Sequence, residues 1–287
     1  PGISNIWHSG RNCASSIPPL RHFWHQYRHT GCPVRRITMK KFEDHFSDHA
    51  GQYAASRPGY PMELFDYLAS LAPDKDLAWD CGTGNGQAAL SLTKHFEQVI
   101  ATDPSAEQIK NAFPNPKIHY RVEPAESTSI EANSVSLITA GTAAHWFNFD
   151  DFYTEVRRVS KTNAIIALWV YHLPEIAPEV DRTLAHYFKH VLDGYWPERV
   201  EYLDKRYTTL PFPFPEVNHP GFSYRTEWSL HQLLGFLDSW SGTQRYLSEI
   251  GKHPVDQIRG TLQHHWGTGE LRRPVFWRLH LRIGRVR

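Results

Sequence analysis

Apolar residues along the middle of the chain follow two alternating patterns. Residues 62–71 carry leucine and phenylalanine at helical spacing. Short stretches rich in apolar and β-branched residues then occur at 77–80, 98–103, 135–140 and 164–171, and a more polar stretch of the same length at 117–122. Polar-apolar stretches with helical periodicity separate them at 87–96, 105–111 and 152–159. Short apolar stretches are typical of buried strands, and their alternation with helices predicts a doubly wound α/β fold with a mainly parallel sheet.

The alternation stops after residue 173. Residues 174–209 are aromatic and of helical character, and residues 210–220 are rich in proline. A strand is expected over 222–230, followed by helices as far as residue 265. Residues 274–286 alternate strongly, with Val275, Trp277, Leu279, Leu281 and Ile283 expected on one face. This last pattern predicts a closing strand, and we expect it to be antiparallel.

Composition narrows the class of protein. Hydrophobic residues make up 40% and aromatic residues 13% of the chain, as suits a globular protein with a sizeable core. No apolar run of about 18 residues is present, so no membrane span is expected. The three cysteines, Cys13, Cys32 and Cys81, lack the spacing of a zinc knuckle and are too few for a disulfide scaffold, so we expect no metal. These features indicate a cytoplasmic enzyme.

Charge divides the chain at Met39. Residues 1–38 hold five arginines, no lysine and no acidic residue. The 26 remaining basic and 30 acidic residues give the rest a net charge of −4, against +1 for the whole chain. We expect residues 1–38 to be a disordered or non-native leader, with a targeting segment or a nucleic-acid arm as alternatives. We expect residues 39–287 to form the folded domain. Because this domain is slightly acidic, we do not expect a nucleic-acid partner.

A glycine motif carries the first chemical signal. The sequence DCGTGNG starts at Asp80, directly after an expected strand. Gly82, Gly84 and Gly86 permit positive φ and close approach of a ligand to the backbone. The dinucleotide fingerprint G-x-G-x-x-G would need glycine at position 87, where Gln87 stands. The motif instead resembles the cofactor loop of class I S-adenosylmethionine (SAM)-dependent methyltransferases, in which an acidic residue precedes the glycines.

Asp103 is the second signal. It ends the second expected strand, 17 positions after Gly86. A carboxylate there can accept hydrogen bonds from both hydroxyls of a ribose. A helix-capping turn with Ser105 is the alternative. The ribose role does not separate SAM from NAD, because both contain adenosine.

Further stretches extend the resemblance over most of residues 40–286. Ala125 and Glu126 are similar to the Ala-Glu pair that meets adenine in methyltransferases, although Pro124 stands where an acid is usual. The sequence His-Trp-Phe at 145–147 resembles a small-molecule subgroup that includes trans-aconitate methyltransferase-like proteins. Tyr53, the RPGYP sequence at 57–61 and the closing sequence at 277–285 match the same subgroup. The resemblance implies a Rossmann-like seven-stranded, mostly parallel sheet with an antiparallel closing strand.

The resemblance also implies cofactor contacts. The glycines would pack against the methionine half of SAM, and Asp80 would order the loop and meet the SAM amino group. Arg57 would pair with the SAM carboxylate, with a surface arginine in a proline turn as the alternative. Tyr53 is counted with the cofactor residues by its match to the subgroup. Trp146 or its neighbour Phe147 would cover the sulfonium, where a cation prefers an aromatic face.

The acceptor side is less specified. His145 follows a parallel strand at the edge where ligands collect, and could take a proton from a substrate hydroxyl or serve only structure. The insert at 174–220 is expected to roof an acceptor pocket, with Arg206 and Arg225 as candidates for binding an acidic group. We predict methyl transfer to an oxygen of a small molecule, such as a carboxylic acid, by a monomer. An NAD-type oxidoreductase and a non-catalytic SAM-binding protein are the alternatives.

Overall fold

The computed structural model describes residues 58–268 and 270–286. The predicted leader, residues 1–38, lies outside them. So do two of the predicted cofactor residues, Tyr53 and Arg57.

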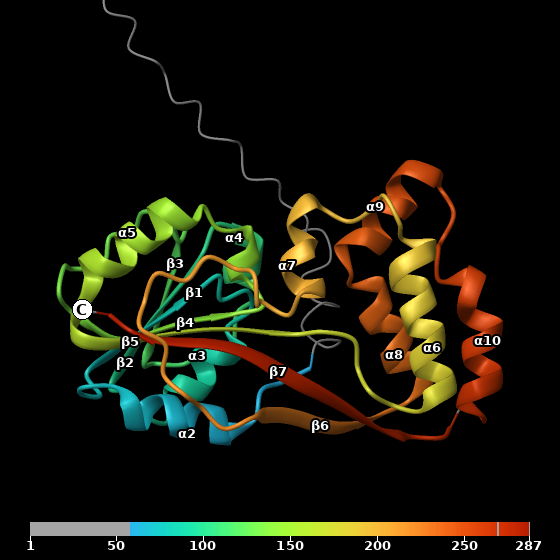
Figure 1. The fold of residues 1–287 in the computed structure, drawn as a ribbon, viewed down its shortest axis with the longest axis horizontal. Coiled ribbons are helices and arrows are strands. Elements are labelled where there is room, and N and C mark those ends of the chain that lie inside the picture. The colour runs from blue at the N-terminus through green and yellow to red at the C-terminus, as the bar shows by residue number, and fades with distance from the viewer. Residues whose placement is uncertain (1–57, 269, 287) are drawn as a thin grey trace, which may run out of the picture. The chain divides into compact units, whose positions relative to one another are not determined.

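A seven-stranded sheet organises the described chain, in the order β3-β2-β1-β4-β5-β7-β6 (Figure 1). Its strands are β1 (Leu77–Cys81), β2 (Gln98–Asp103), β3 (Ile118–Val122), β4 (Val135–Gly141), β5 (Ser160–Tyr171), β6 (Phe222–Trp228) and β7 (Arg273–Arg285). Neighbours among β1 to β5 pair in parallel. Strand β7 is antiparallel to both β5 and β6. The predicted mostly parallel sheet with an antiparallel closing strand is confirmed.

Helices cover both faces of the sheet because β5 is apolar on both sides. Ile165, Ala167 and Trp169 pack in one core cluster, and the alternate residues Ile166 and Leu168 pack in the other. The first cluster includes side chains of α2 (Met62–Leu71) and α3 (Gln87–Leu92), and the second those of α5 (Phe149–Val159). Figure 1 shows α2 and α3 on the face opposite α5. The continuous apolar strand β5 is therefore buried on both faces, as its sequence predicts.

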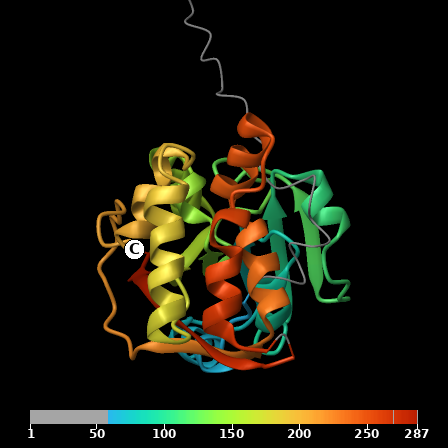
Figure 2. The same ribbon diagram turned by 90° about the vertical axis from the view of Figure 1, so that its right-hand side faces the viewer.

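A helical lobe lies beyond the end of β5 (Figures 1 and 2). It consists of α6 (Pro178–His186), α8 (Leu230–Asp238), α9 (Ser241–Ile250) and α10 (Asp256–Trp266). The short α4 (Ala106–Lys110) and α7 (Glu201–Asp204) complete the α-helices of the described residues. No helix in this part of the chain is long and apolar enough to cross a membrane.

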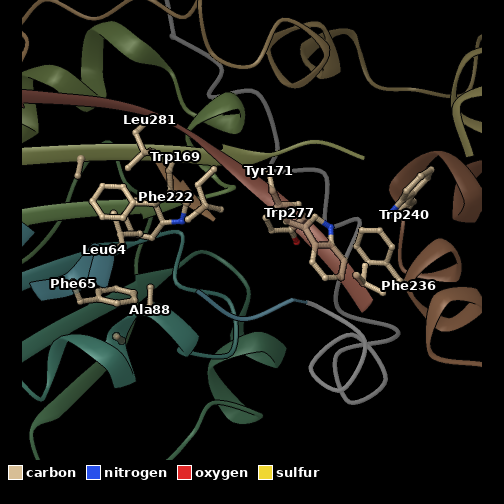
Figure 3. Close-up of a cluster of buried hydrophobic side chains, with 14 of the residues drawn as sticks. Leu64, Phe65, Ala88, Trp169, Tyr171, Phe222, Phe236, Trp240, Trp277 and Leu281 are labelled. Atoms are coloured by element: carbon tan, nitrogen blue, oxygen red, sulfur yellow. The ribbon is translucent and has the colours of Figure 1, made fainter. Parts of the chain in front are cut away.

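Strand β7 joins the lobe to the sheet. Its first half pairs with β6 and its second half with β5, and Leu279 is the residue that both partners share. Trp277, in the first half, is fully buried, with ring centroids 4.7 Å from Trp228 and 6.0 Å from Phe236 of α8. Figure 3 shows Trp277 and Phe236 in one apolar cluster that runs from Phe65 to Trp240. The lobe thus shares its core with the sheet.

The proline-rich segment packs along the second half of β7. Val217 N donates to Ile283 O over 2.8 Å, and Arg285 N donates to Pro215 O over 3.1 Å. This approach is possible because residue 284 is glycine. A Cβ atom there would lie 2.7 Å from Phe214 Cβ and 2.8 Å from the Phe212 ring.

We therefore expect Gly284→Ala to lower the free energy of unfolding by about 1–3 kcal/mol, because the added methyl group overpacks the contact. Gly260→Ala is the matched control. It lies inside α10 with nothing within 4 Å of the added Cβ, and should raise stability by about 0.5–1 kcal/mol. Urea unfolding of both variants measures the difference. Equal free energies of unfolding for the two variants would show that the proline-rich segment moves aside without loss of stability.

Candidate cofactor and acceptor site

The glycine loop, residues 82–86, is anchored by a buried carboxylate at the end of β1. Asp80 is only 1% exposed. Its Oδ2 accepts a hydrogen bond from Thr83 Oγ1 over 2.6 Å, and its Oδ1 accepts one from Thr139 Oγ1 of β4 over 2.7 Å. The loop is tied to β2 as well, because Thr83 N donates to Thr102 O over 3.0 Å. These contacts order the glycine loop around Asp80, as the sequence predicted.

The three glycines of the loop meet different surroundings. Their φ angles are +63° at Gly82, +55° at Gly84 and +88° at Gly86. A Cβ atom on Gly82 would lie 2.5 Å from Ala143 Cβ, and one on Gly86 would overlap the Tyr120 hydroxyl. On Gly84 it would meet only one side-chain atom, at 3.9 Å. Two glycines therefore permit close packing, and the third leaves open space beside the loop.

Asp103 lies across from this space at the end of β2. Its Oδ2 accepts from Gly84 N and its Oδ1 from Ser105 N, each over 2.9 Å. Ser105 in turn caps α4, since its Oγ accepts from Gln108 N over 3.2 Å. The capping turn considered from the sequence is thus present. Each carboxylate oxygen has two lone pairs, so the predicted ribose contact is compatible with it.

The loop after β3 holds the predicted adenine residues. Ala125 is 4% exposed. Glu126 Oε1 accepts from Asn148 N over 2.8 Å, at the start of α5. Glu123, the other carboxylate considered, accepts from Ser129 N over 3.1 Å and from Ser129 Oγ. Both carboxylates thus accept hydrogen bonds from backbone N–H groups nearby. An adenine contact at Ala125 and Glu126 stays a prediction.

His145 and Trp146 belong to a 3₁₀ turn, Ala144–Trp146, that follows β4. His145 is 4% exposed, and its Nδ1 lies 2.9 Å from the hydroxyl oxygen of the fully buried Tyr207. Phe147 packs into the core instead, with its ring centroid 4.8 Å from that of Phe152. The two aromatic residues considered for a cation-covering role therefore lie in different places: the Phe147 ring lies beside Gly82 of the glycine loop, and Trp146 lines the cavity described next. The cation-covering role stays a prediction for both.

A cavity of about 690 Å³, counting its open mouth, lies beside this turn. Its walls come from the ends of β4 and β5, the segment 188–203 and the corner between α8 and α9. They are formed by Thr142, His145, Trp146, Tyr171, His172, Leu173, Phe188, Trp196, Pro197, Val200, Leu203, Phe236, Trp240 and Ser241. No lysine, arginine or carboxylate is among these described residues.

The insert at 174–220 contributes to this cavity only in part. Trp196 lines it, whereas Phe212 and Phe214 pack against Tyr153, with ring centroids 6.5 and 5.3 Å from it. Arg206 and Arg225 are exposed and are not among the lining residues. The role considered for them as acid-binding residues at this cavity is not supported.

Several site residues were missed from the sequence. Phe236, Trp240 and Ser241 reach the cavity only because the lobe folds over the end of the sheet. Thr142 has a left-handed backbone, with φ of 55°, and its buried Oγ1 has no hydrogen-bond partner among the described residues. A β-branched residue rarely adopts this conformation, so such strain often marks a functional site. No local sequence pattern predicts the contribution of the lobe to the cavity or the strained backbone of Thr142.

Comparison with known proteins agrees with this geometry. Residues 79–168 match the family described as methyltransferase domain. A Dictyostelium discoideum protein assigned as a methyltransferase is 34% identical over 78% of this chain and 87% of the relative. A Saccharomyces cerevisiae protein assigned as a SAM-dependent methyltransferase is 27% identical over 73% of this chain and 82% of the relative. The solved structure of a protein assigned as a type II methyltransferase from Anaeromyxobacter dehalogenans is 39% identical, with a TM-score of 0.74 over 80% of this chain and 98% of that one.

The chain belongs to the class I SAM-dependent methyltransferases, and SAM is its cofactor. The residues present fit this group. Gly84 leaves open space, Asp103 lies beside it, and the buried Asn85 Nδ2 in the same loop has no hydrogen-bond partner among the described residues. The methyltransferase interpretation is thus confirmed, and the alternative of an NAD-type oxidoreductase, with which Asp103 was equally compatible, is not.

Burial raises the pKa of Asp80 from 3.8 to about 6, although the hydrogen bonds from Thr83 and Thr139 oppose the rise. The folded state therefore holds the proton more tightly than the unfolded chain. This contribution to stability is complete below about pH 4 and is lost as the pH rises through about 6.

We accordingly expect Asp80→Asn to gain stability relative to the wild type by up to about 3 kcal/mol between pH 4 and pH 7. Denaturant unfolding without cofactor at several pH values measures this change, and Asp193→Asn at the surface is the control. A stability difference that stays constant with pH would contradict the raised pKa.

Proposed function

We propose that the protein transfers a methyl group from SAM to an oxygen of a small molecule bound in the aromatic cavity. The observation that supports this is the turn after β4, which contacts both the glycine loop and the cavity. Ala143 and Phe147 lie against Gly82, while Thr142, His145 and Trp146 line the cavity. A cofactor on the loop and an acceptor in the cavity would thus face the same short segment.

The cofactor side of the proposal uses residues of β1, β2 and the loop after β3. Asp80 and the glycine loop would hold the amino acid end of SAM, Asp103 the ribose, and Ala125 with Glu126 the adenine. Tyr53 and Arg57 remain predicted contacts outside the described residues. When bound, SAM supplies a methyl group on a positively charged sulfur, and Trp146 offers that charge an aromatic face.

The cavity favours an acceptor with an apolar body and few polar groups. The cavity is lined mostly by rings and aliphatic side chains, as is usual for sites that bind small molecules. Few of its lining side chains carry polar atoms other than a ring N–H: His145, His172, Thr142, Ser241 and the Tyr171 phenol. Because no cationic side chain is among these described walls, a polyanion would be poorly stabilised there. We therefore favour a neutral or singly charged acceptor over one resembling trans-aconitate, which carries three carboxylates.

An oxygen acceptor agrees with the sequence after β4. Enzymes that methylate planar amines usually carry an Asn-Pro-Pro-Tyr-like motif there, and this chain has Gly141-Thr142-Ala143-Ala144 instead. A carboxylate acceptor needs only correct positioning, which by itself accelerates transfer strongly. A hydroxyl acceptor also has to lose a proton, a role for which the sequence suggested His145.

The proposal is tested by screening neutral phenols, aromatic monocarboxylic acids and tricarboxylic acids with methyl-labelled SAM. Leu203→Trp, which narrows the cavity, should lower kcat/KM for the best acceptor by at least about tenfold. The Kd for SAM should stay unchanged. Leu271→Trp, at a side chain 42% exposed outside the cavity, is the matched control. Tricarboxylic acids as the sole acceptors, or unchanged activity of Leu203→Trp, would argue against the proposed pocket.

The ribose role of Asp103 is separable from its capping role. Asp103→Ala should weaken SAM binding by roughly 2 kcal/mol, through the loss of charge-assisted hydrogen bonds. Ser105→Ala removes the α4 cap but keeps the carboxylate, so it should cost about 1 kcal/mol of stability and leave SAM affinity intact. Isothermal titration and denaturant unfolding give the two quantities. Equal loss of affinity in both variants would mean that Asp103 acts only through the turn.

A further inference from the structure

We propose that Tyr207 is a positioning residue that holds neutral His145 in the tautomer protonated at Nε2. The two side chains are buried, and the Tyr207 hydroxyl oxygen lies 2.9 Å from His145 Nδ1. Which atom donates in this hydrogen bond decides the tautomer. If Tyr207 donates, Nδ1 must be the unprotonated nitrogen, and Nε2 carries the hydrogen.

The surroundings of the phenol oxygen indicate that it donates. The backbone N–H groups of Ala144 and His145 face this oxygen, and they offset part of the rise in the Tyr207 pKa that burial causes. Donors therefore lie toward the lone pairs of the oxygen. A phenol has one hydrogen, and His145 Nδ1 is the acceptor within hydrogen-bond distance of it. Because the net effect of burial keeps the phenol protonated, that hydrogen is present at neutral pH.

The backbone around Tyr207 is built to aim this phenol. Arg206 and Tyr207 have φ angles of 54° and 59°, a left-handed conformation that an aromatic residue rarely adopts. Arg282 of β7 holds the segment in place, since its Nη1 donates to Tyr207 O over 3.2 Å and to Leu210 O over 3.0 Å. Its Nε and Nη2 donate to the Glu216 carboxylate over 3.0 and 2.7 Å. A strained residue that is held by several hydrogen bonds indicates that the position of its side chain matters for function.

The tautomer changes what His145 offers to the cavity. Its Nδ1 edge is engaged by Tyr207, so a hydrogen bond from the ring to a bound acceptor would come from the opposite edge, which carries Nε2. The neutral ring would then donate a hydrogen there and would not accept one. This consequence rests on the proposed function. It makes His145 a hydrogen-bond donor to the acceptor oxygen, in place of the proton acceptor that the sequence suggested.

The tautomer can be read directly by NMR of the full chain labelled with ¹⁵N-histidine, recorded with neither cofactor nor acceptor. Long-range proton–nitrogen correlations identify the protonated ring nitrogen, and the His145→Gln spectrum assigns the His145 signals. We expect a single neutral form with the hydrogen on Nε2. A hydrogen on Nδ1 in the wild type would overturn the proposal, whether or not any variant folds.

Tyr207→Phe removes the donor, and the His145 signals should then show both tautomers. The matched control is Tyr187→Phe, which also deletes a buried hydroxyl, bonded to Thr243 Oγ1 over 2.8 Å, and should leave the His145 signals in place. Unchanged His145 signals in Tyr207→Phe would equally refute the positioning role.

Kinetics test the consequence separately. With the acceptor found by screening, Tyr207→Phe should lower kcat by about tenfold and leave the Kd for SAM unchanged. Combined with His145→Gln, it should cause no further loss, because one residue acts through the other. Additive losses would contradict the coupling. If no acceptor is found but Nε2 carries the hydrogen, the proposed function fails and the tautomer assignment stands.

Discussion

The buried carboxylate of Asp80 is the interaction on which the site depends. It binds the Thr83 hydroxyl in the glycine loop and the Thr139 hydroxyl in β4. Strand β4 then leads into the turn that carries His145 and Trp146. The cofactor loop and one wall of the acceptor cavity therefore share an anchor. The anchor is costly, because burial of the carboxylate raises its pKa, and the two hydroxyls recover only part of that cost.

Strand β7 supplies the second constraint. Half of it extends the sheet beside β5, and half carries β6 and Trp277 beneath the helical lobe. Arg282 and Gly284, on the sheet half, hold the segment that contains Tyr207 and the proline-rich stretch after it. One strand thus places the lobe that closes the cavity and the tyrosine that contacts His145. A change in its register would disturb both, although Tyr207 lies far from β7 in the sequence.

The cavity lies where the turn anchored through Asp80 and the lobe placed by β7 meet. Its aromatic and aliphatic walls are less polar than water, so each polar group in them has a stronger effect than it would in solvent. Binding energy there comes mainly from apolar area, while orientation comes from a few side chains near the turn after β4. That division suits methyl transfer, which depends more on the alignment of donor and acceptor than on covalent participation of the protein.

The sequence by itself determined the elements of the sheet and the cofactor loop. Period-two and period-3.6 patterns are local, and a glycine triplet between a strand and a helix has few backbone solutions. Asp80 and Asp103 could be found for the same reason, since each immediately ends a strand. The tertiary structure alone decided the cavity, because Trp240 and Phe236 meet Thr142 there although they lie more than ninety positions away, and Thr142 itself has a strained backbone. It also decided that Tyr207 faces His145, since that contact depends on β7 holding a left-handed turn that no sequence pattern encodes.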